Sequence, residues 1–134
     1  MSGQPKRNIM VVDDEVKVCR SIQQALLCDA YEVDAVLSGE EALRLEDTRR
    51  HDVILVDLMM PGLSGLDLLK CLRAKNLSAK IIMITGYPTL KATVQSMEFG
   101  AFEFLPKPFL PVELREQVAR ALAALDAERE LGKG

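Results

Sequence analysis

The 134-residue sequence has no tryptophan, one histidine and few aromatic residues. No stretch approaches the roughly 18 consecutive apolar residues that a membrane span needs, and the short polar start MSGQPKRN does not resemble a secretion signal. The net charge is -3, and there is no block of Lys or Arg of the kind that nucleic-acid-binding domains carry. We therefore expect a cytoplasmic protein that neither spans a membrane nor binds nucleic acid directly.

Cysteine and histidine, which are common ligands of transition metals, are also scarce. Three cysteines, Cys19, Cys28 and Cys71, are odd in number and lack metal-binding spacing. This suits a reducing compartment, where buried thiols behave as small apolar side chains. The single histidine, His51, stands beside Asp52 before an apolar run and is expected in a surface loop. We assign no chemistry to these cysteines or to the histidine.

The sequence does contain the material for one compact domain, because 49% of its residues are hydrophobic. Short aliphatic and β-branched runs alternate with longer stretches of helical periodicity, which is the pattern of βα units around a parallel sheet. Capping-box spacing marks two expected helix starts, at Ser38 and Ser64, and Gly100 marks an expected helix end. The five expected strands lie in residues 8–14, 31–38, 52–58, 80–86 and 102–108.

The order of these strands follows from which runs are apolar throughout. The runs that end at Asp13, Asp57 and Thr85 are almost uninterrupted, as expected for strands covered on both faces. Residues 31–36 alternate instead, and Glu103 separates two phenylalanines, which places the second and fifth strands at the edges. With right-handed crossovers, the simplest α/β solution is a doubly wound, five-stranded parallel sheet in the order 2-1-3-4-5.

Polar side chains stand at the ends of four of these strands. They are Asp13 and Asp14 after the first, Asp57 on the third, Thr85 on the fourth and Lys107 on the fifth. Alone, each has an ordinary explanation as a helix cap, a turn residue, a last strand residue or a solvated loop lysine. The carboxyl ends of parallel strands open onto one crevice, however, and coincidences at four strand ends favour a functional site there.

The charges at this expected site call for a cation. Two carboxylates about 4 Å apart repel each other by roughly 4 kcal/mol at an effective dielectric constant of about 20, so three need compensation. Lys107 supplies one positive charge, and an all-oxygen site suits Mg²⁺. Asp57 can then attack phosphorus, with Lys107 and the Thr85 hydroxyl stabilising the transferred group. No Gly-rich phosphate-binding loop follows any strand, which disfavours a nucleotide-dependent switch.

Four motifs together carry a resemblance to a known family. They are Asp13-Asp14, the segment DLMMPGLSG at residues 57–65, Thr85-Gly86 and Lys107-Pro108. The set resembles the receiver domain of bacterial two-component response regulators, which implies a flavodoxin-like, chemotaxis-regulator-like three-layer sandwich. The resemblance covers residues 8–125. Residues 1–7 are then expected to be a flexible N-terminus, and residues 126–134 a frayed tail, a dimer contact or the start of a linker to an effector.

The resemblance implies roles for these residues. Asp57 would accept a phosphoryl group from the phosphohistidine of a sensor histidine kinase or phosphotransfer protein, or from a small phosphodonor. Asp14, Asp57 and the backbone carbonyl of Met59 would hold Mg²⁺, and Asp13 would orient it through water. The peptide bond before Pro108 would be cis. The domain would be a signalling module whose only chemistry is its own phosphorylation and autodephosphorylation.

The resemblance also locates a switch. Phosphorylation would draw the Thr85 hydroxyl toward the phosphoryl group, and the ring of Phe104 would rotate into the vacated space. The face formed by the fourth helix, fifth strand and fifth helix would change, and an effector domain, a target protein or a second copy of the chain would bind there. Many relatives have Tyr at this position, whereas phenylalanine lacks the hydroxyl, and a plain core role for Phe104 is the alternative.

Bulky uncharged side chains near the acceptor predict a long-lived phosphorylated state. Met59 lies two residues after Asp57, and Tyr87 lies two residues after Thr85. Both positions can screen an acyl phosphate from water. We therefore expect slow autodephosphorylation.

Two other functions fit parts of the same residue set. A Mg²⁺-dependent aspartyl-phosphate phosphohydrolase of the haloacid dehalogenase type also combines an Asp nucleophile, a Thr or Ser, a Lys and acidic ligands. That class carries its nucleophile in a D-x-D motif on its first motif strand, whereas here the first strand has adjacent aspartates and the isolated acceptor, Asp57, ends the third. A degenerate receiver that only binds is disfavoured, because every chemical position is filled.

Overall fold

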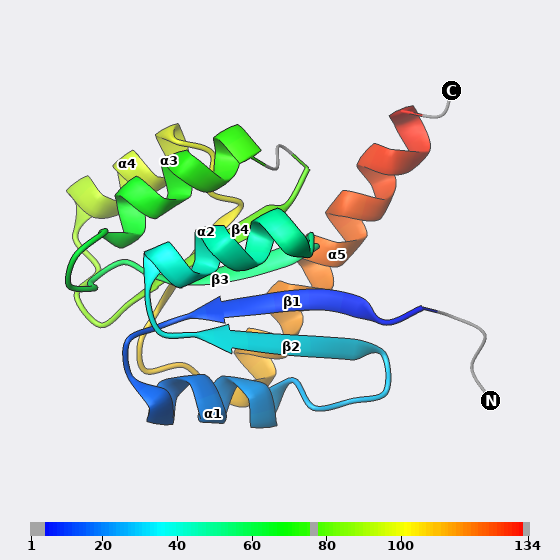
Figure 1. The fold of residues 1–134 in the computed structure, drawn as a ribbon, viewed down its shortest axis with the longest axis horizontal. Helices are drawn as coiled ribbons and strands as arrows, with labels where there is room; N and C mark the ends of the chain where they lie inside the picture. The colour runs from blue at the N-terminus through cyan, green and yellow to red at the C-terminus, as the bar shows by residue number, and fades with distance from the viewer. Residues whose placement is uncertain (1–4, 76–77, 133–134) are drawn as a thin grey trace.

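The computed structural model describes residues 5–75 and 78–132, which form five strands and five helices in alternation (Figure 1). The strands are β1 (Arg7–Val12), β2 (Tyr31–Val36), β3 (Val53–Asp57), β4 (Lys80–Thr85) and β5 (Glu103–Pro106). The helices are α1 (Val16–Ala25), α2 (Gly39–Thr48), α3 (Gly65–Lys75), α4 (Leu90–Glu98) and α5 (Pro111–Gly132).

All five strands pair in parallel in the order β2-β1-β3-β4-β5, which confirms the predicted topology. The central strands β1, β3 and β4 are buried over most of their length, and the edge strands β2 and β5 are partly exposed. The alternation predicted for β2 is not strict, because Ala35 is exposed and Val36 is buried. The edge positions themselves are as predicted.

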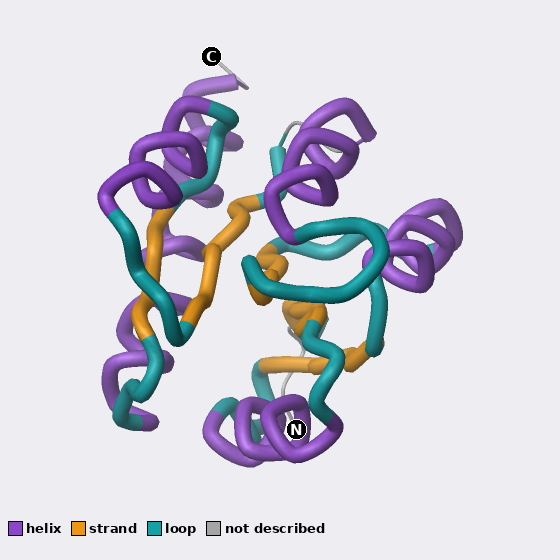
Figure 2. Tube along the Cα trace, turned by 90° about the vertical axis from the view of Figure 1, so that its left-hand side faces the viewer, coloured by secondary structure: helices purple, strands orange, loops and turns teal. Residues whose placement is uncertain are grey.

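Helices cover both faces of the sheet and make the predicted three-layer sandwich (Figure 2). On one face, α1 and α5 contribute Ile22 and Val118 to a buried apolar cluster. On the other, α2 and α3 contribute Ala42 and Leu69 to a second cluster. Because all strands run the same way, the segments that follow them meet at one edge of the sheet. Within residues 5–75 and 78–132, none of the helices combines the length and apolar character that crossing a membrane requires.

The helix ends follow the predicted signals. The Ser38 Oγ accepts a hydrogen bond from the Glu41 backbone N–H at 3.2 Å, and the Ser64 Oγ accepts one from Asp67 at 3.2 Å. Gly100, just beyond α4, has a φ of 97°, a left-handed conformation that favours glycine. Short-range signals therefore determine where these three helices begin or end.

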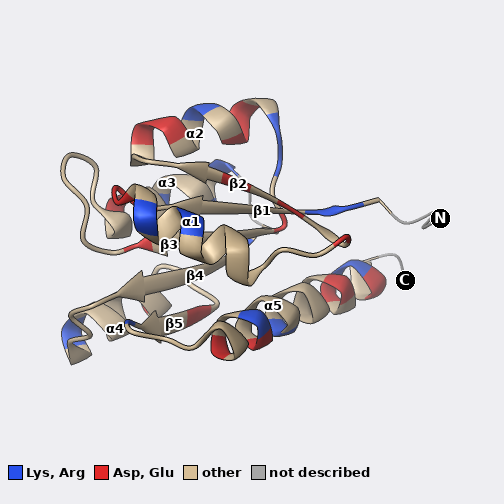
Figure 3. Cartoon of the chain, turned by 90° about the horizontal axis from the view of Figure 1, so that it is seen from below, with Lys and Arg blue, Asp and Glu red and all other residues tan. Residues whose placement is uncertain are grey.

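The last turns of α5 form ion pairs with residues at the amino-terminal end of the sheet. The pairs are Arg7–Asp126, Arg129–Asp52 and Lys80–Glu128. Figure 3 shows the charged residues on these last turns. Arg7 is the first residue of β1, although it belongs to the segment predicted to be flexible. Residues 1–4 and 133–134, the ends of the predicted flexible N-terminus and of the predicted tail or linker, lie outside the described residues.

His51 lies in the connection between α2 and β3, as predicted, but the prediction that it is at the surface is wrong. Its side chain is buried, and its Nδ1 and Nε2 lie 2.8 Å from Glu46 Oε1 and 2.7 Å from Asp34 Oδ2. Burial alone lowers the pKa of His51, but the hydrogen bonds and charges of the two carboxylates outweigh it and raise that pKa. His51 is therefore a buried link between α2 and β2, and its two carboxylate partners favour the protonated ring.

Candidate functional site

Three carboxylates meet where β1 and β3 end. Asp13, Asp14 and Asp57 each offer an oxygen, and these oxygens lie within 4.8 Å of one another. Asp13 and Asp57 are buried, whereas Asp14 is exposed. The middles of β1, β3 and β4 carry no charge (Figure 3), and the acidic residues come directly after β1 and at the end of β3. The structure thus brings together the three acidic residues that were predicted as one site; we call them the acidic trio.

Local hydrogen bonds orient two of these carboxylates. The Asp13 Oδ1 accepts from the Glu15 backbone N–H at 2.9 Å, just before α1 begins. The Asp57 Oδ1 accepts from the Met59 N–H at 3.2 Å. Each bond spans two residues, the pattern of an Asx turn. The carboxylates are therefore held in place by the chain that leaves the strand.

The environment of Asp57 makes its charge costly. Burial is the largest effect and raises its pKa, the charge of Asp13 adds to it, and Lys107 and the Met59 N–H oppose them. The net result is a pKa of about 6 instead of 3.8. An added cation would favour the ionised carboxylate, so the acidic trio has the charge and the oxygen donors that a divalent metal ion requires.

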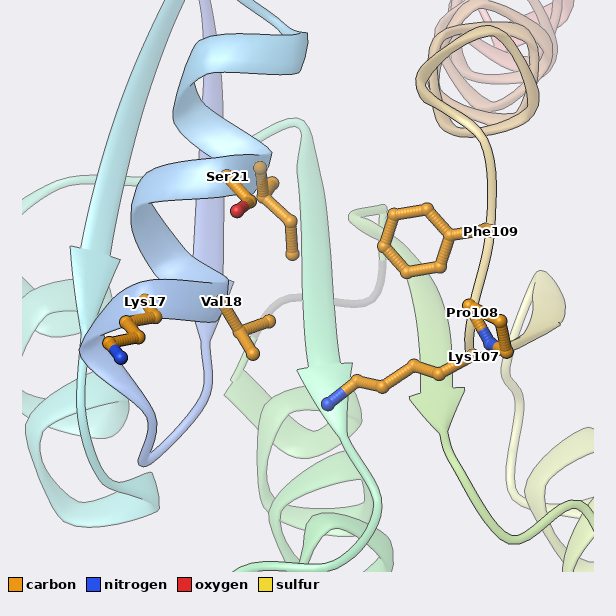
Figure 4. A pocket seen from close by; sticks show the side chains of 7 residues that line it. Lys17, Val18, Ser21, Lys107, Pro108 and Phe109 are labelled. Atoms are coloured by element: carbon orange, nitrogen blue, oxygen red, sulfur yellow. The ribbon is translucent and has the colours of Figure 1, made fainter.

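Lys107 approaches the acidic trio from the segment after β5. Its Nζ lies 3.1 Å from Asp13 Oδ2 and 4.0 Å from Asp57 Oδ1. Its backbone N–H donates to the Thr85 carbonyl at 2.7 Å, and its peptide bond to Pro108 is cis, as the resemblance implied. Figure 4 shows the side chain pointing toward the end of β3, beside a pocket lined by residues of α1 and of the segment after β5.

The predicted switch residues lie on the two strands beyond β3: Thr85 ends β4, directly after the Ile84 that pairs with Asp57, and Phe104 lies in β5. Thr85 is fully buried, and its hydroxyl oxygen accepts a hydrogen bond from the Tyr87 backbone N–H at 3.1 Å. Phe104 is half-buried and packs against the cluster on the α2 and α3 face. Met59 and Tyr87, the predicted screening residues, have exposed side chains. The sequence indicated these positions but not the Thr85 to Tyr87 hydrogen bond.

Gly65 ends the acceptor segment, residues 57–65, and has a packing role at the site that was not predicted from the sequence. Its N–H donates to the Leu58 carbonyl at 3.1 Å and closes the loop that follows Asp57. A Cβ at this position would overlap the Asp57 carbonyl oxygen and lie 2.6 Å from Leu58 Cα. In the sequence, Gly65 is the last residue of that motif and follows the expected helix start at Ser64. Its role becomes visible when α3 is placed directly over the end of β3.

Comparison with known proteins connects this geometry to a family. The response regulator receiver domain family matches residues 9–119. The chain is 35% identical over 116 residues to the alkaline phosphatase synthesis transcriptional regulatory protein PhoP of Bacillus subtilis, covering 87% of this chain and 48% of that protein. It is 32% identical over 123 residues to the regulatory protein AtoC of Escherichia coli, covering 92% of this chain and 27% of that protein. The chain thus spans about half, or less, of the length of these curated relatives.

Solved structures show the same architecture. A response regulator receiver domain protein (CheY-like) from Methanospirillum hungatei JF-1 has a TM-score of 0.89 at 29% identity, over 92% of this chain and 99% of that chain. NtrX from Brucella abortus has a TM-score of 0.90 at 27% identity, over 96% of this chain and 29% of that chain. These matches confirm the predicted fold, and the family match gives no support to the phosphohydrolase alternative.

Proposed function

The chain belongs to the response regulator receiver domain family, the signalling domain of two-component systems, and on this premise we propose that Asp57 is its phosphoryl acceptor. The observation that carries the proposal is the acidic trio, whose oxygens lie within 4.8 Å of one another, with the Lys107 Nζ 3.1 Å from Asp13. A buried carboxylate among other carboxylates and one ammonium group is suited to phosphoryl transfer, which depends mainly on positioning and charge stabilisation.

Asp13, Asp14, Asp57 and the backbone carbonyl of Met59 would hold Mg²⁺. The fit rests on the donor set, which is all oxygen, and on the raised pKa of Asp57, since burial and Asp13 both disfavour its ionised form. When bound, Mg²⁺ neutralises charge on the carboxylates and on the phosphoryl oxygens. The roles of Asp14 and of the carbonyl as ligands, and of Asp13 in orienting the metal through water, are part of this proposal.

The transfer itself uses the ionised carboxylate of Asp57. One carboxylate oxygen forms a bond to phosphorus while the bond between phosphorus and the donor atom breaks, and the leaving group keeps that electron pair. With a phosphohistidine donor, the leaving group is the imidazole nitrogen. The Lys107 ammonium stabilises negative charge on the phosphoryl oxygens, and the Met59 N–H keeps the carboxylate oriented. The only chemistry proposed for the chain is this step and the later hydrolysis of the aspartyl phosphate, in which water takes the phosphoryl group, inorganic phosphate leaves and the Asp57 carboxylate is restored.

The switch requires Thr85 to exchange one hydrogen bond for another. Its hydroxyl oxygen accepts from Tyr87 in this conformation, and we propose that it turns to donate to the phosphoryl group, which adds about two units of negative charge. Phe104 would then move into the space beside β5 that Thr85 vacates. The phosphoryl group would contact Thr85 only in the switched conformation. This difference in contacts would favour the switched conformation over the one described here.

The output surface is proposed to be the face of α4, β5 and α5. Exposed apolar side chains support this, because such residues on a folded domain favour contact with a partner. They are Leu90, Val94 and Met97 on α4 and Val112 on α5. A target protein, an effector domain or a second copy of the chain would bind there. Because the chain spans about half of its relatives' length, the output of the whole protein is also a proposal.

The phosphoryl donor is proposed to be a sensor histidine kinase or a phosphotransfer protein, and the location cytoplasmic. The test uses labelled acetyl phosphate, a small phosphodonor, with wild type and Asp57→Asn, each with Mg²⁺ or with EDTA. We expect stoichiometric labelling only for wild type with Mg²⁺. Labelling of Asp57→Asn, or multiple turnover of p-nitrophenyl phosphate by wild type, would contradict the proposal, and the latter would favour a phosphohydrolase.

A further inference from the structure

We propose that Gly39, the first residue of α2, is a positioning residue that seats the loop between β3 and α3 over the acidic trio. This loop, residues 58–64, contains Met59, whose carbonyl is a proposed metal ligand. The inference rests on the proposed function of the site. It adds a residue that touches none of the reacting groups and acts only through the loop.

The inner end of the loop is fastened by backbone hydrogen bonds. The Leu58 N–H donates to the Ile84 carbonyl at 2.8 Å, and the Gly65 N–H donates to the Leu58 carbonyl at 3.1 Å. Met59 follows directly and donates to the Asp57 carboxylate. These bonds hold the start and the end of the loop together. The outer part, residues 60–63, therefore needs a separate support.

That support is the first turn of α2. Leu63 is half-buried and packs against the apolar cluster on the α2 and α3 face. A Cβ at Gly39 would lie 2.8 Å from Leu63 Cδ2, closer than carbon atoms pack, and 3.2 Å from Leu63 Cβ and Cγ, which is tighter than most such contacts. The neighbouring residue of the loop, Gly62, faces Glu40 of the same turn. Leu63 thus occupies the space that a side chain at position 39 would fill.

Backbone conformation does not explain why this residue is glycine. The φ angle of Gly39 lies outside the left-handed region. Among the glycines that the structure describes, Gly62 and Gly100 adopt that region. Within a helix, alanine is favoured over glycine by about 1 kcal/mol. Gly39 is also buried, so exposure to solvent gives no reason for a small residue. The close packing of Leu63 remains as the reason for glycine at position 39. It is the loop, and not the helix, that requires the small residue.

Adding a methyl group at position 39 should therefore move the loop. The Leu63 Cδ2, at the tip of the side chain, must turn away, and the Leu63 Cβ and Cγ must move by a few tenths of an ångström. A displacement of about 1 Å in a positioned group can change function by about 10²-fold, so this smaller one should have a smaller effect. The loop is closed on itself at Leu58 and Gly65, so the displacement reaches Met59. We expect weaker Mg²⁺ binding and a less ordered loop, with little loss of overall stability because alanine suits the helix.

The experiment measures Mg²⁺ affinity by titration calorimetry and amide exchange of residues 58–64 in the metal-free protein. For Gly39→Ala we expect about tenfold weaker affinity and about threefold faster loop exchange, and for Leu63→Ala about threefold weaker affinity. The double variant should lose about threefold, and not the roughly thirtyfold of independent effects, because the shortened side chain at position 63 leaves room for the methyl group at position 39. Gly132→Ala is the matched control, since a Cβ there meets nothing within 4 Å.

The proposal is overturned if Gly39→Ala and Leu63→Ala both bind Mg²⁺ and exchange their loop amides as wild type does. It is also overturned if the two losses simply multiply in the double variant. Should Gly39→Ala fail to fold, Leu63→Ala with wild-type affinity and wild-type loop exchange would still overturn it. If wild type itself binds no Mg²⁺, the proposed function fails instead, and loop exchange in the metal-free proteins still tests the role of Gly39.

Discussion

Replacing the acceptor with its neutral isostere should stabilise the metal-free protein. Asp57 is 5% exposed, and burial followed by repulsion from Asp13 raises its pKa from 3.8 to about 6. At about 1.4 kcal/mol per pH unit, keeping this carboxylate ionised costs the folded state about 3 kcal/mol. Asp57→Asn removes that cost and keeps an oxygen that can accept from the Met59 N–H. We therefore expect the variant to be more stable than wild type by up to about 3 kcal/mol at pH 8 in EDTA.

The pH dependence follows from the sign of this shift. The pKa of Asp57 is higher in the folded state than in the unfolded state. The free-energy cost of its ionised carboxylate is therefore fully present above the folded-state pKa and disappears below the unfolded-state pKa. The predicted difference between Asp57→Asn and wild type falls from about 3 kcal/mol at pH 8 to about half of that at pH 5. Mg²⁺ should stabilise wild type more than the variant and so reduce the difference at pH 8.

Urea denaturation followed by far-UV circular dichroism gives the free energies of unfolding, a suitable probe because the chain has no tryptophan. Each protein is measured in EDTA at both pH values and in Mg²⁺ at pH 8. The reasoning is refuted if Asp57→Asn is less stable than wild type at pH 8 in EDTA, or if the difference is the same at pH 5.

Three further perturbations have expected outcomes. Lys107→Ala should slow phosphorylation by acetyl phosphate about 10²-fold, because it removes a preorganised cation, and an unchanged initial rate would contradict that role. Met59→Asn or Tyr87→Ala should speed the decay of the phosphorylated protein by admitting water, and decay at the wild-type rate would remove the screening hypothesis. His51→Asn should lower the free energy of unfolding by about 3–5 kcal/mol, as loss of one member of a buried charge cluster does. Because the pKa of His51 is raised, this stabilisation is complete below the unfolded-state pKa and is lost as pH rises through the folded value, so the loss in His51→Asn should shrink at alkaline pH.

The sheet order and the acidic trio could be predicted because they depend on patterns that the sequence displays directly. Uninterrupted apolar runs mark the central strands, and parallel strands necessarily end at one edge. Asp13 and Asp57, which follow the paired residues Val12 and Val56, are therefore neighbours in space although they lie far apart in the chain. The helix cap at Ser38 and the left-handed conformation of Gly100 could also be predicted, because each depends on residues close by in the sequence.

Other features depend on contacts that only the assembled fold creates. His51 was expected at the surface because one of its carboxylate partners, Asp34, belongs to β2 and is distant in the sequence. The packing roles of Gly39 and Gly65 could not be predicted, since they lie in the close approach of Leu63 and of the Asp57 backbone. Sequence patterns report which residues face a core, but they do not report which backbone must pass within van der Waals contact of another.

The most direct test of the central claim is to locate the phosphoryl group. The protein is phosphorylated with acetyl phosphate and Mg²⁺, trapped by borohydride reduction and mapped by peptide mass spectrometry. We expect a single modified residue, Asp57, and no modification when Mg²⁺ is chelated. Modification at any other residue, or an unmodified Asp57 in folded protein with Mg²⁺ present, would contradict it.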